Sequence, residues 1–473
     1  MNPQVRMLTT ALGIALPWAP LHASADDAAL QALVERLERL EQRLGAPPAS
    51  PADDVADLQS RLAILERKLE IQAEEAAAKA PTTPAVAINE KGLAVKTPKG
   101  DFDLKLRGTV QFDQRWFFDD DAAPINDTQG FRRLRPSLEG TLTPLLTYRI
   151  TPELAGDSAS VVDAYLDVRF DPRYTLRAGK VKGPVSLERL QSASAITMIE
   201  RSFATELAPN RDIGVQLQGE IFAGRAQYVI GLYNGAADGR DAPSQDADNH
   251  QEWAGRVFFE PWRNSANALS GLGFGIAASI GDKEGAGNNF LPRYRSPGQN
   301  VFFNYRSTVL ANGEHRRWSP QAYYYRNRLG LLGEYIRSGQ ALTLSNNPAA
   351  HASLQNDAWQ LTASWVLTGE DASYKGIAKP DQPFTLGAPG WGAFELVARY
   401  GELDVDDDAF PLYASADASA TEARAWGIGL NWYLTSNLKL VVNHARARFS
   451  GGASGGRDRP DEKTLLTRLQ VAF

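Results

Sequence analysis

The amino-acid sequence predicts an all-β fold: a transmembrane antiparallel β-barrel of about 16 strands, preceded by a short N-terminal helical or coiled-coil segment. Three observations lead to this fold class. The N-terminus has the features of an export signal, polar and apolar residues alternate from residue 101 onward, and short connections alternate with long ones between the predicted strands.

The first predicted element is a secretory signal peptide over residues 1–25. Arg6 precedes an apolar stretch, and an A-x-A arrangement ends at Ala25, so we expect cleavage before Asp26. A membrane-anchoring helix would need about 18–20 apolar residues, and prolines interrupt this stretch before that length is reached. The mature chain is therefore expected to be exported.

Residues 26–90 are predicted to form a helical, coiled-coil and Pro/Ala-rich linker segment. Its leucines fall into two seams, Leu30, Leu33, Leu37, Leu40 and Leu44, and then Leu58, Leu62, Leu65 and Leu69. Steps of three and four residues are typical of the a and d positions of a coiled coil. We expect a periplasmic coiled coil that joins identical subunits, and an amphipathic helix on a larger surface is the alternative.

Residues 91–473 are predicted to form the barrel, and Leu104–Trp116 shows the alternation most clearly. A period of two residues indicates a β-strand with one polar and one apolar face. The apolar set, which should face lipid, contains Leu106, Val110 and Phe112. The polar set, which should face an aqueous interior, contains Lys105, Arg107 and Gln111.

Connection lengths predict an up-and-down meander with all long loops at one end. The long connections are residues 184–210, 235–250, 281–316, 338–357, 402–421 and 450–463. A soluble sandwich has no reason to sort its loops in this way, whereas an outer-membrane barrel has short periplasmic turns and long external loops. The expected location is the bacterial outer membrane, in contact with its lipid.

About 16 strands would leave an open aqueous lumen, and its predicted lining is rich in cations. The strand and loop positions expected to face it include Lys105, Arg107, Arg132, Arg133, Arg135, Arg201, Arg293 and Arg295. Guanidinium groups are permanently charged and match oxyanion edges, so such a lining favours anions. The alternative is a weakly selective pore, in which carboxylates neutralise these arginines.

Enzymatic and nucleic-acid-binding functions find little support. The chain has no cysteine and no H-E-x-x-H, G-x-S-x-G or P-loop motif, so we expect no catalytic residues, metal or cofactor. His444, on a weak strand, is the only candidate for a barrel enzyme, and an adhesin is a further alternative. A net charge of −6 gives no reason to expect nucleic acid as a partner.

Several stretches, read together and in order from about residue 92 to 473, resemble the phosphate-selective porin O and P family. They are FRRLRPSLEG, ERSFATELAPNRDIGVQLQG, AGRVFFEPW, WVLTGE, GAFELVARY, GLNWYL and RLQVAF. The resemblance implies a homotrimeric outer-membrane channel of 16-stranded barrels, with inward-folded loops and an arginine-lined route for small inorganic anions. It also implies that Arg132, Arg133, Arg201 and Asp163 occupy the family's anion-site positions.

The third loop departs from the family pattern. Phosphate-specific members carry a lysine shortly before the ER dipeptide, whereas QSASAITMIER has Ser194 at about that place and no cation between Arg189 and Arg201. We therefore expect passive diffusion of small anions, phosphate or related oxyanions, with phosphate passing without strongly blocking chloride.

Overall fold

The computed structural model describes residues 35, 39, 51–79, 84–118, 125–377 and 379–473. The chain divides into two units, Met1–Pro81 and Thr82–Phe473. In the first unit, helix α2 (Pro51–Lys79) carries the second leucine seam, and the first seam lies outside the described residues. The helices of the described part are all too short or too polar to cross a membrane.

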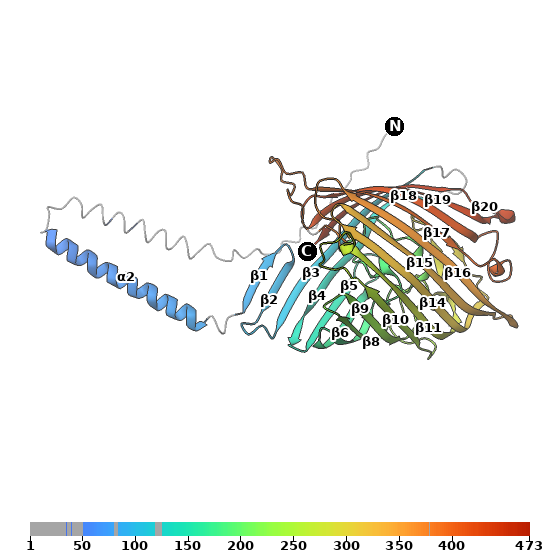
Figure 1. Cartoon of the computed structure of the whole chain (residues 1–473), viewed down its shortest axis with the longest axis horizontal. Coiled ribbons are helices and arrows are strands. Elements are labelled where there is room, and N and C mark those ends of the chain that lie inside the picture. Colours follow the sequence, from blue (N-terminus) through green and yellow to red (C-terminus); the bar gives the residue numbers. More distant parts are fainter. Residues whose placement is uncertain (1–34, 36–38, 40–50, 80–83, 119–124, 378) are drawn as a thin grey trace, which may run out of the picture. The chain divides into compact units, whose positions relative to one another are not determined.

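Sixteen strands of the second unit form a closed antiparallel barrel, as the sequence predicted (Figure 1). They are β3 (Asp103–Phe118), β4 (Thr128–Thr143), β5 (Leu146–Glu153), β6 (Ser160–Asp171), β7 (Tyr174–Val181), β8 (Asp212–Ile221), β9 (Ala226–Tyr233), β10 (Glu252–Phe259), β11 (Leu272–Ala286), β14 (Val309–Arg326), β15 (Leu329–Leu344), β16 (Asn347–Val366), β17 (Ala393–Asp404), β18 (Ala420–Tyr433), β19 (Leu438–Ala453) and β21 (Glu462–Ala472). Pairing of β21 with β3 closes the barrel, so this sheet has no free edge along the pairing.

Short elements occupy the connections. They are α3 (Leu187–Leu190), η1 (Phe203–Leu207), η2 (Ala268–Gly271), η3 (Gly287–Asn289), β12 (Arg293–Arg295), β13 (Val301–Asn304), η4 (Asp407–Ala409), η5 (Ser454–Gly456) and β20 (Arg457–Asp458). We call the end of the barrel with the β3–β4 and β7–β8 connections the loop end. The opposite end, which holds Phe473, is the turn end.

A hairpin precedes the barrel and pairs with it. Strands β1 (Ala85–Asn89) and β2 (Gly92–Lys96) pair with each other, and β2 then pairs with residues 103–106 of β3. The predicted linker, 26–90, therefore ends in a strand. Strands β1 and β2 have five residues each, which is too short for a clear alternation of polar and apolar residues. The alternation in the sequence therefore begins only at residue 101.

The side chains of β3 alternate between the outer and inner faces of the barrel, as the sequence predicted. Leu106 and Phe112 are 40% and 38% exposed on the outer face, whereas Gln111 is fully buried inside. The exposed apolar side chains form the surface that meets lipid, and the buried polar ones line the interior.

The prediction for connection 338–357 was wrong. Strands β15 and β16 run through this stretch as one long hairpin, and only Ser345 and Asn346 separate them. The outer part of this hairpin is rich in small and polar residues, so its sequence resembles a loop. Conversely, the connection between β16 and β17 is long although it lies at the turn end.

Loop 3, the connection 182–211, lies inside the barrel and is held by two separate parts of the wall. On one wall, Glu334 of β15 accepts hydrogen bonds from Ser186 Oγ (2.8 Å) and from the backbone nitrogens of Leu187 (2.7 Å) and Glu188 (3.2 Å). On a second part of the wall, side chains of β3, β19 and β21 donate to loop 3 carbonyl oxygens, and these donors are Gln111, Lys439, Arg468 and Gln470. Loop 3 therefore crosses the lumen.

Part of the lumen is filled by apolar side chains, in contrast to the open aqueous interior that the strand number suggested. Rings of the β12–β13 hairpin, among them Tyr294 and Phe302, pack on Phe203 of η1 and on inward-facing Ile336 and Leu354. These inward positions lie on β15 and β16. The lumen beside β15 and β16 is therefore packed rather than open.

Candidate anion site in the lumen

A β-bulge in β4 brings two consecutive arginines into the lumen. Phe131 pairs with Phe112, and Arg133 pairs with Gln111, so Arg132 is an extra residue in β4. A regular strand would send neighbouring side chains to opposite faces. Because of the bulge, both guanidinium groups find partners inside the barrel.

Arg132 is neutralised by loop 3. Its Nε and Nη2 atoms donate to the two carboxylate oxygens of Glu200, at 2.7 and 3.1 Å. Arg115 also contacts Glu200 (2.8 Å), and Arg468 binds Asp113 through two hydrogen bonds of 2.6 and 2.8 Å. This network fastens loop 3 to the wall and leaves Arg132 little free charge for a passing anion.

Most of the other predicted wall residues are also paired. Lys105 lies 3.0 Å from Asp103, and Arg135 lies 2.7 Å from Glu153. Arg107 forms an ion pair with Glu139, and Asp163 lies 3.2 Å from Arg211. The alternative in which carboxylates neutralise the wall cations therefore holds for these side chains.

A different set of side chains is rich in cations and poor in ion pairs. This cation cluster consists of Arg133 of β4 and of Lys182, Arg189, Arg201 and Arg211 of loop 3. Within the described residues, Arg211 is its only member with an ion pair, the contact with Asp163. Each of the other four cations binds neutral oxygens only.

Neutral partners orient these cations without cancelling their charge. Arg133 Nη1 donates to Gln111 Oε1 (2.6 Å), and Arg201 donates to the carbonyl oxygens of Glu188 (3.2 Å) and Gln191 (2.8 Å). Lys182 Nζ shares the Gln191 carbonyl at 2.8 Å. One carbonyl therefore joins an ammonium and a guanidinium group.

Two loop 3 carboxylates that lie close to Arg201, Glu188 and Glu200, are occupied by other arginines. Glu188 binds Arg399 at 2.7 Å, and Glu200 binds Arg115 and Arg132. Burial, followed by repulsion from Arg211 and Arg201, holds the pKa of Lys182 well below its usual value.

A second group of cations lies in the external loops. Arg293 and Arg295 of β12 lie near Arg240 of the β9–β10 connection, and none of these three arginines has an ion pair in the described part of the chain. Burial and then the charge of Arg295 lower the pKa of Arg293, and burial and then Arg293 lower the pKa of Arg240. Mutual repulsion of this kind is relieved by an anion.

Ser194 lies away from the cation cluster. Its Oγ atom contacts Ser192 Oγ (2.9 Å), and it lines a pocket of about 410 Å³ at the turn end together with Arg107 and Arg149. The cation cluster itself includes residues that sequence reasoning did not select. Arg211 belongs to the NRDIG part of the stretch ERSFATELAPNRDIGVQLQG, so the family resemblance includes this residue. The sequence did not show that the Arg211 side chain points inward, because this direction depends on where β8 begins.

The site is suited to binding and passing anions rather than to covalent chemistry. It offers fixed cations and carbonyl oxygens, and no group of three His, Asp or Glu side chains in the described residues could hold a metal ion. Guanidinium and ammonium groups at successive points along a wall are what an anion filter requires.

Comparison with known proteins agrees with this arrangement. The family model "Phosphate-selective porin O and P" matches residues 102–473. Porin O of Pseudomonas aeruginosa is 26% identical over 415 residues, which cover 81% of this chain and 91% of that protein. An uncharacterized protein of Caulobacter vibrioides is 24% identical over 406 residues, which cover 80% of this chain and 76% of that protein.

Among solved structures, the outer membrane channel DcaP of Acinetobacter baumannii has a similar fold. The TM-score is 0.50 at 12% identity, and the match covers 80% of this chain and 99% of that one. This likeness concerns the fold alone. With the family match, it identifies a channel of the bacterial outer membrane rather than an enzyme. The chain belongs to the phosphate-selective porin O and P family.

Proposed function

We propose that this porin conducts small inorganic anions, phosphate or related oxyanions, by passive diffusion through a passage beside the cation cluster. The observation that carries the proposal is the charge balance of that cluster, five cations with a single ion pair in the described residues. A permeating anion needs attraction that replaces part of its hydration, but no site so strong that it stays.

The order of cations along the lumen supports a route. Arg240, Arg293 and Arg295 at the loop end would attract anions from outside, and the cation cluster would form the selective part. Lys105, Arg107 and Arg135 lie beyond it on the wall, each paired with a carboxylate. Paired cations attract an anion less strongly, which favours release into the periplasm.

The decisive experiment is the reversal potential of the purified porin in planar bilayers under a KCl gradient. We expect anion selectivity, and we expect the double variant Arg133→Ala/Arg201→Ala to lower the anion/cation permeability ratio severalfold. Arg316→Ala is the matched control, because Arg316 is about half exposed and pairs with Glu314 (3.4 Å). A cation-selective wild-type channel would refute the proposal.

A general, weakly selective diffusion porin is the second candidate function. The observation in its favour is that four of the predicted wall cations, Lys105, Arg107, Arg132 and Arg135, are neutralised by carboxylates. In that case the anion/cation permeability ratio of the wild-type channel would lie close to one, and the ratio of the double variant would be the same as that of the wild type.

A further inference from the structure

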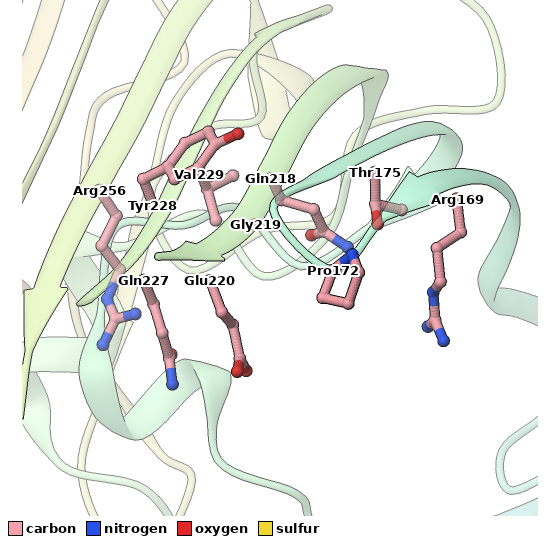
Figure 2. A pocket seen from close by; sticks show the side chains of 10 residues that line it. All are labelled: Arg169, Pro172, Thr175, Gln218, Gly219, Glu220, Gln227, Tyr228, Val229 and Arg256. Carbon is pink, nitrogen blue, oxygen red and sulfur yellow. The ribbon is translucent and has the colours of Figure 1, made fainter. Parts of the chain in front are cut away.

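A cavity at the turn end lies below loop 3 and combines rings with cations. Two adjoining pockets, of about 440 and 550 Å³, share Glu220, Gln227 and Arg256 in their walls. Figure 2 shows these three side chains extending side by side into the first pocket, with Arg169 on its other side. They come from β8, β9 and β10, so the cavity belongs to a rigid part of the barrel.

Four aromatic side chains meet in the second pocket. Tyr323 packs against Phe258 (5.0 Å between ring centroids) and Tyr325 (5.5 Å), and it stacks on Tyr374 (5.2 Å, 22° between planes). Gly273, which has no side chain, lies beside the Phe258 ring. A Cβ atom at Gly273 would lie 2.6 Å from the Phe258 ring, so glycine is required for the ring to lie flat there.

The connection between β16 and β17 supplies one of these rings. Tyr374 reaches loop 3, where its hydroxyl donates to the Leu187 carbonyl oxygen (2.6 Å), and its own carbonyl accepts from Gln191 Nε2 (2.6 Å). Gln191 is also the residue whose carbonyl oxygen binds Lys182 and Arg201. The rings therefore adjoin the cation cluster, with one residue of loop 3 between them.

The charge of the cavity is positive. Arg256 has one hydrogen bond, from Nε to Gln321 Oε1 (2.9 Å), and within the described residues it has no ion pair. Its guanidinium group lies over the Phe258 ring at 4.3 Å. Arg263 and Glu260 pair with each other at 3.5 Å, which leaves Arg256, Lys375 and Arg169 against Glu220.

We propose that this ring-lined cavity binds organic anions that carry a flat ring, with the anionic group on Arg256 and the ring against Tyr323, Tyr325 and Tyr374. The inference deepens the proposed function, and rests on it, because it adds a substrate class to the same anion channel. A guanidinium group offers paired donors to a phosphate or carboxylate, and aromatic faces favour offset or edge contacts with a second ring. An inorganic anion uses only the first of these features.

The test is block of the chloride current through the full-length porin in planar bilayers, with probes added on the periplasmic side. We expect phenyl phosphate to block at a concentration at least tenfold lower than inorganic phosphate. Arg256→Gln should weaken block by both probes, and Tyr325→Leu should abolish the advantage of phenyl phosphate and leave block by inorganic phosphate unchanged. The second variant keeps every charge, so its effect isolates the ring contact.

Two outcomes would overturn the inference. Equal block by phenyl phosphate and inorganic phosphate would show that the rings contribute nothing, and it would leave the proposed anion channel intact. Stronger block by benzylammonium than by phenyl phosphate would show that Glu220 and Glu260, not Arg256, govern the cavity. Failure of the proposed function is recognised separately, by the reversal potential of the wild-type channel without any probe.

Discussion

The charge of Lys182 depends on its surroundings. Because burial and two nearby guanidinium groups lower its pKa, its proton is lost at a lower pH than the usual lysine value of 10.5. We expect the anion/cation permeability ratio to fall as the pH rises, with a midpoint well below 10.5. The measurement is the reversal potential under a KCl gradient between pH 6 and pH 10.

Lys182→Arg provides the control for this titration. Arginine keeps its charge throughout the pH range, so the ratio in this variant should stay flat where the wild type declines. Lys182→Gln should give a low ratio at every pH. A wild-type ratio that remains constant up to pH 10 would contradict the assignment of Lys182 to the selective part of the passage.

Ser194 tests how phosphate selectivity arises at the residue scale. Its half-buried side chain lines the same pocket as Arg107 and Arg149, so a lysine has room there and adds a charge near two guanidinium groups. We expect Ser194→Lys to strengthen phosphate block of the chloride current severalfold, with Ser194→Gln as the uncharged control. Tight block of the wild-type channel by micromolar phosphate would show that the existing arginines suffice.

At the scale of elements, the sequence predicted side-chain directions that follow from the alternation within one strand. It missed contacts between residues that are far apart in the chain. The face of Gln111 follows from alternation within β3. The pairing of Arg132 with Glu200 does not, because the two residues are 68 positions apart and meet only when loop 3 enters the barrel. The bulge that turns Arg132 inward is also invisible, since it is defined by the register of β4 on β3.

Loop 3 gives the element-scale prediction, because one wall side chain binds the N-terminus of its helix α3. Glu334 accepts from Ser186 Oγ and from the first backbone nitrogens of α3, the groups that a helix leaves without partners. Glu334→Ala leaves buried donors unsatisfied, at a cost of roughly 1–3 kcal/mol. We expect a looser loop 3, seen as greater open-channel noise in single-channel recordings.

Two further variants serve as controls for the Glu334→Ala experiment. Glu334→Gln keeps one acceptor oxygen and should lie between the wild type and the alanine variant. Glu314→Ala, on the neighbouring strand, removes an exposed carboxylate that pairs with Arg316, and it should leave the noise unchanged. Noise in Glu334→Ala equal to that of the wild type would mean that the other wall contacts hold loop 3 without Glu334.

At the scale of the whole molecule, we propose a homotrimer whose subunits also meet in the periplasm through α2. Leu58, Leu62, Leu65 and Leu69 form one stripe on this helix and are 65%, 59%, 50% and 65% exposed in the single chain. Exposed leucines at a and d spacing are what a coiled coil would bury. The sequence identified this stripe but not the length of the helix. The residues that follow the seam are mostly alanine and glutamate, so the leucine spacing that marks the helix does not continue through them.

Two deletions separate the contribution of α2 from that of the β1–β2 hairpin. Removing residues 26–81 should leave conductance and selectivity unchanged and lower the temperature at which trimers dissociate on unheated gels. Removing residues 26–96 also takes away β2. Residues 103–106 of β3 then keep β4 as a partner but have none on their other side, because β21 pairs only from Thr109 onward. Unpaired backbone at the barrel edge costs stability, so this longer deletion should also lower the unfolding temperature of the monomeric barrel. Loss of channel activity in the shorter deletion, or unchanged trimer stability, would show that α2 has another role.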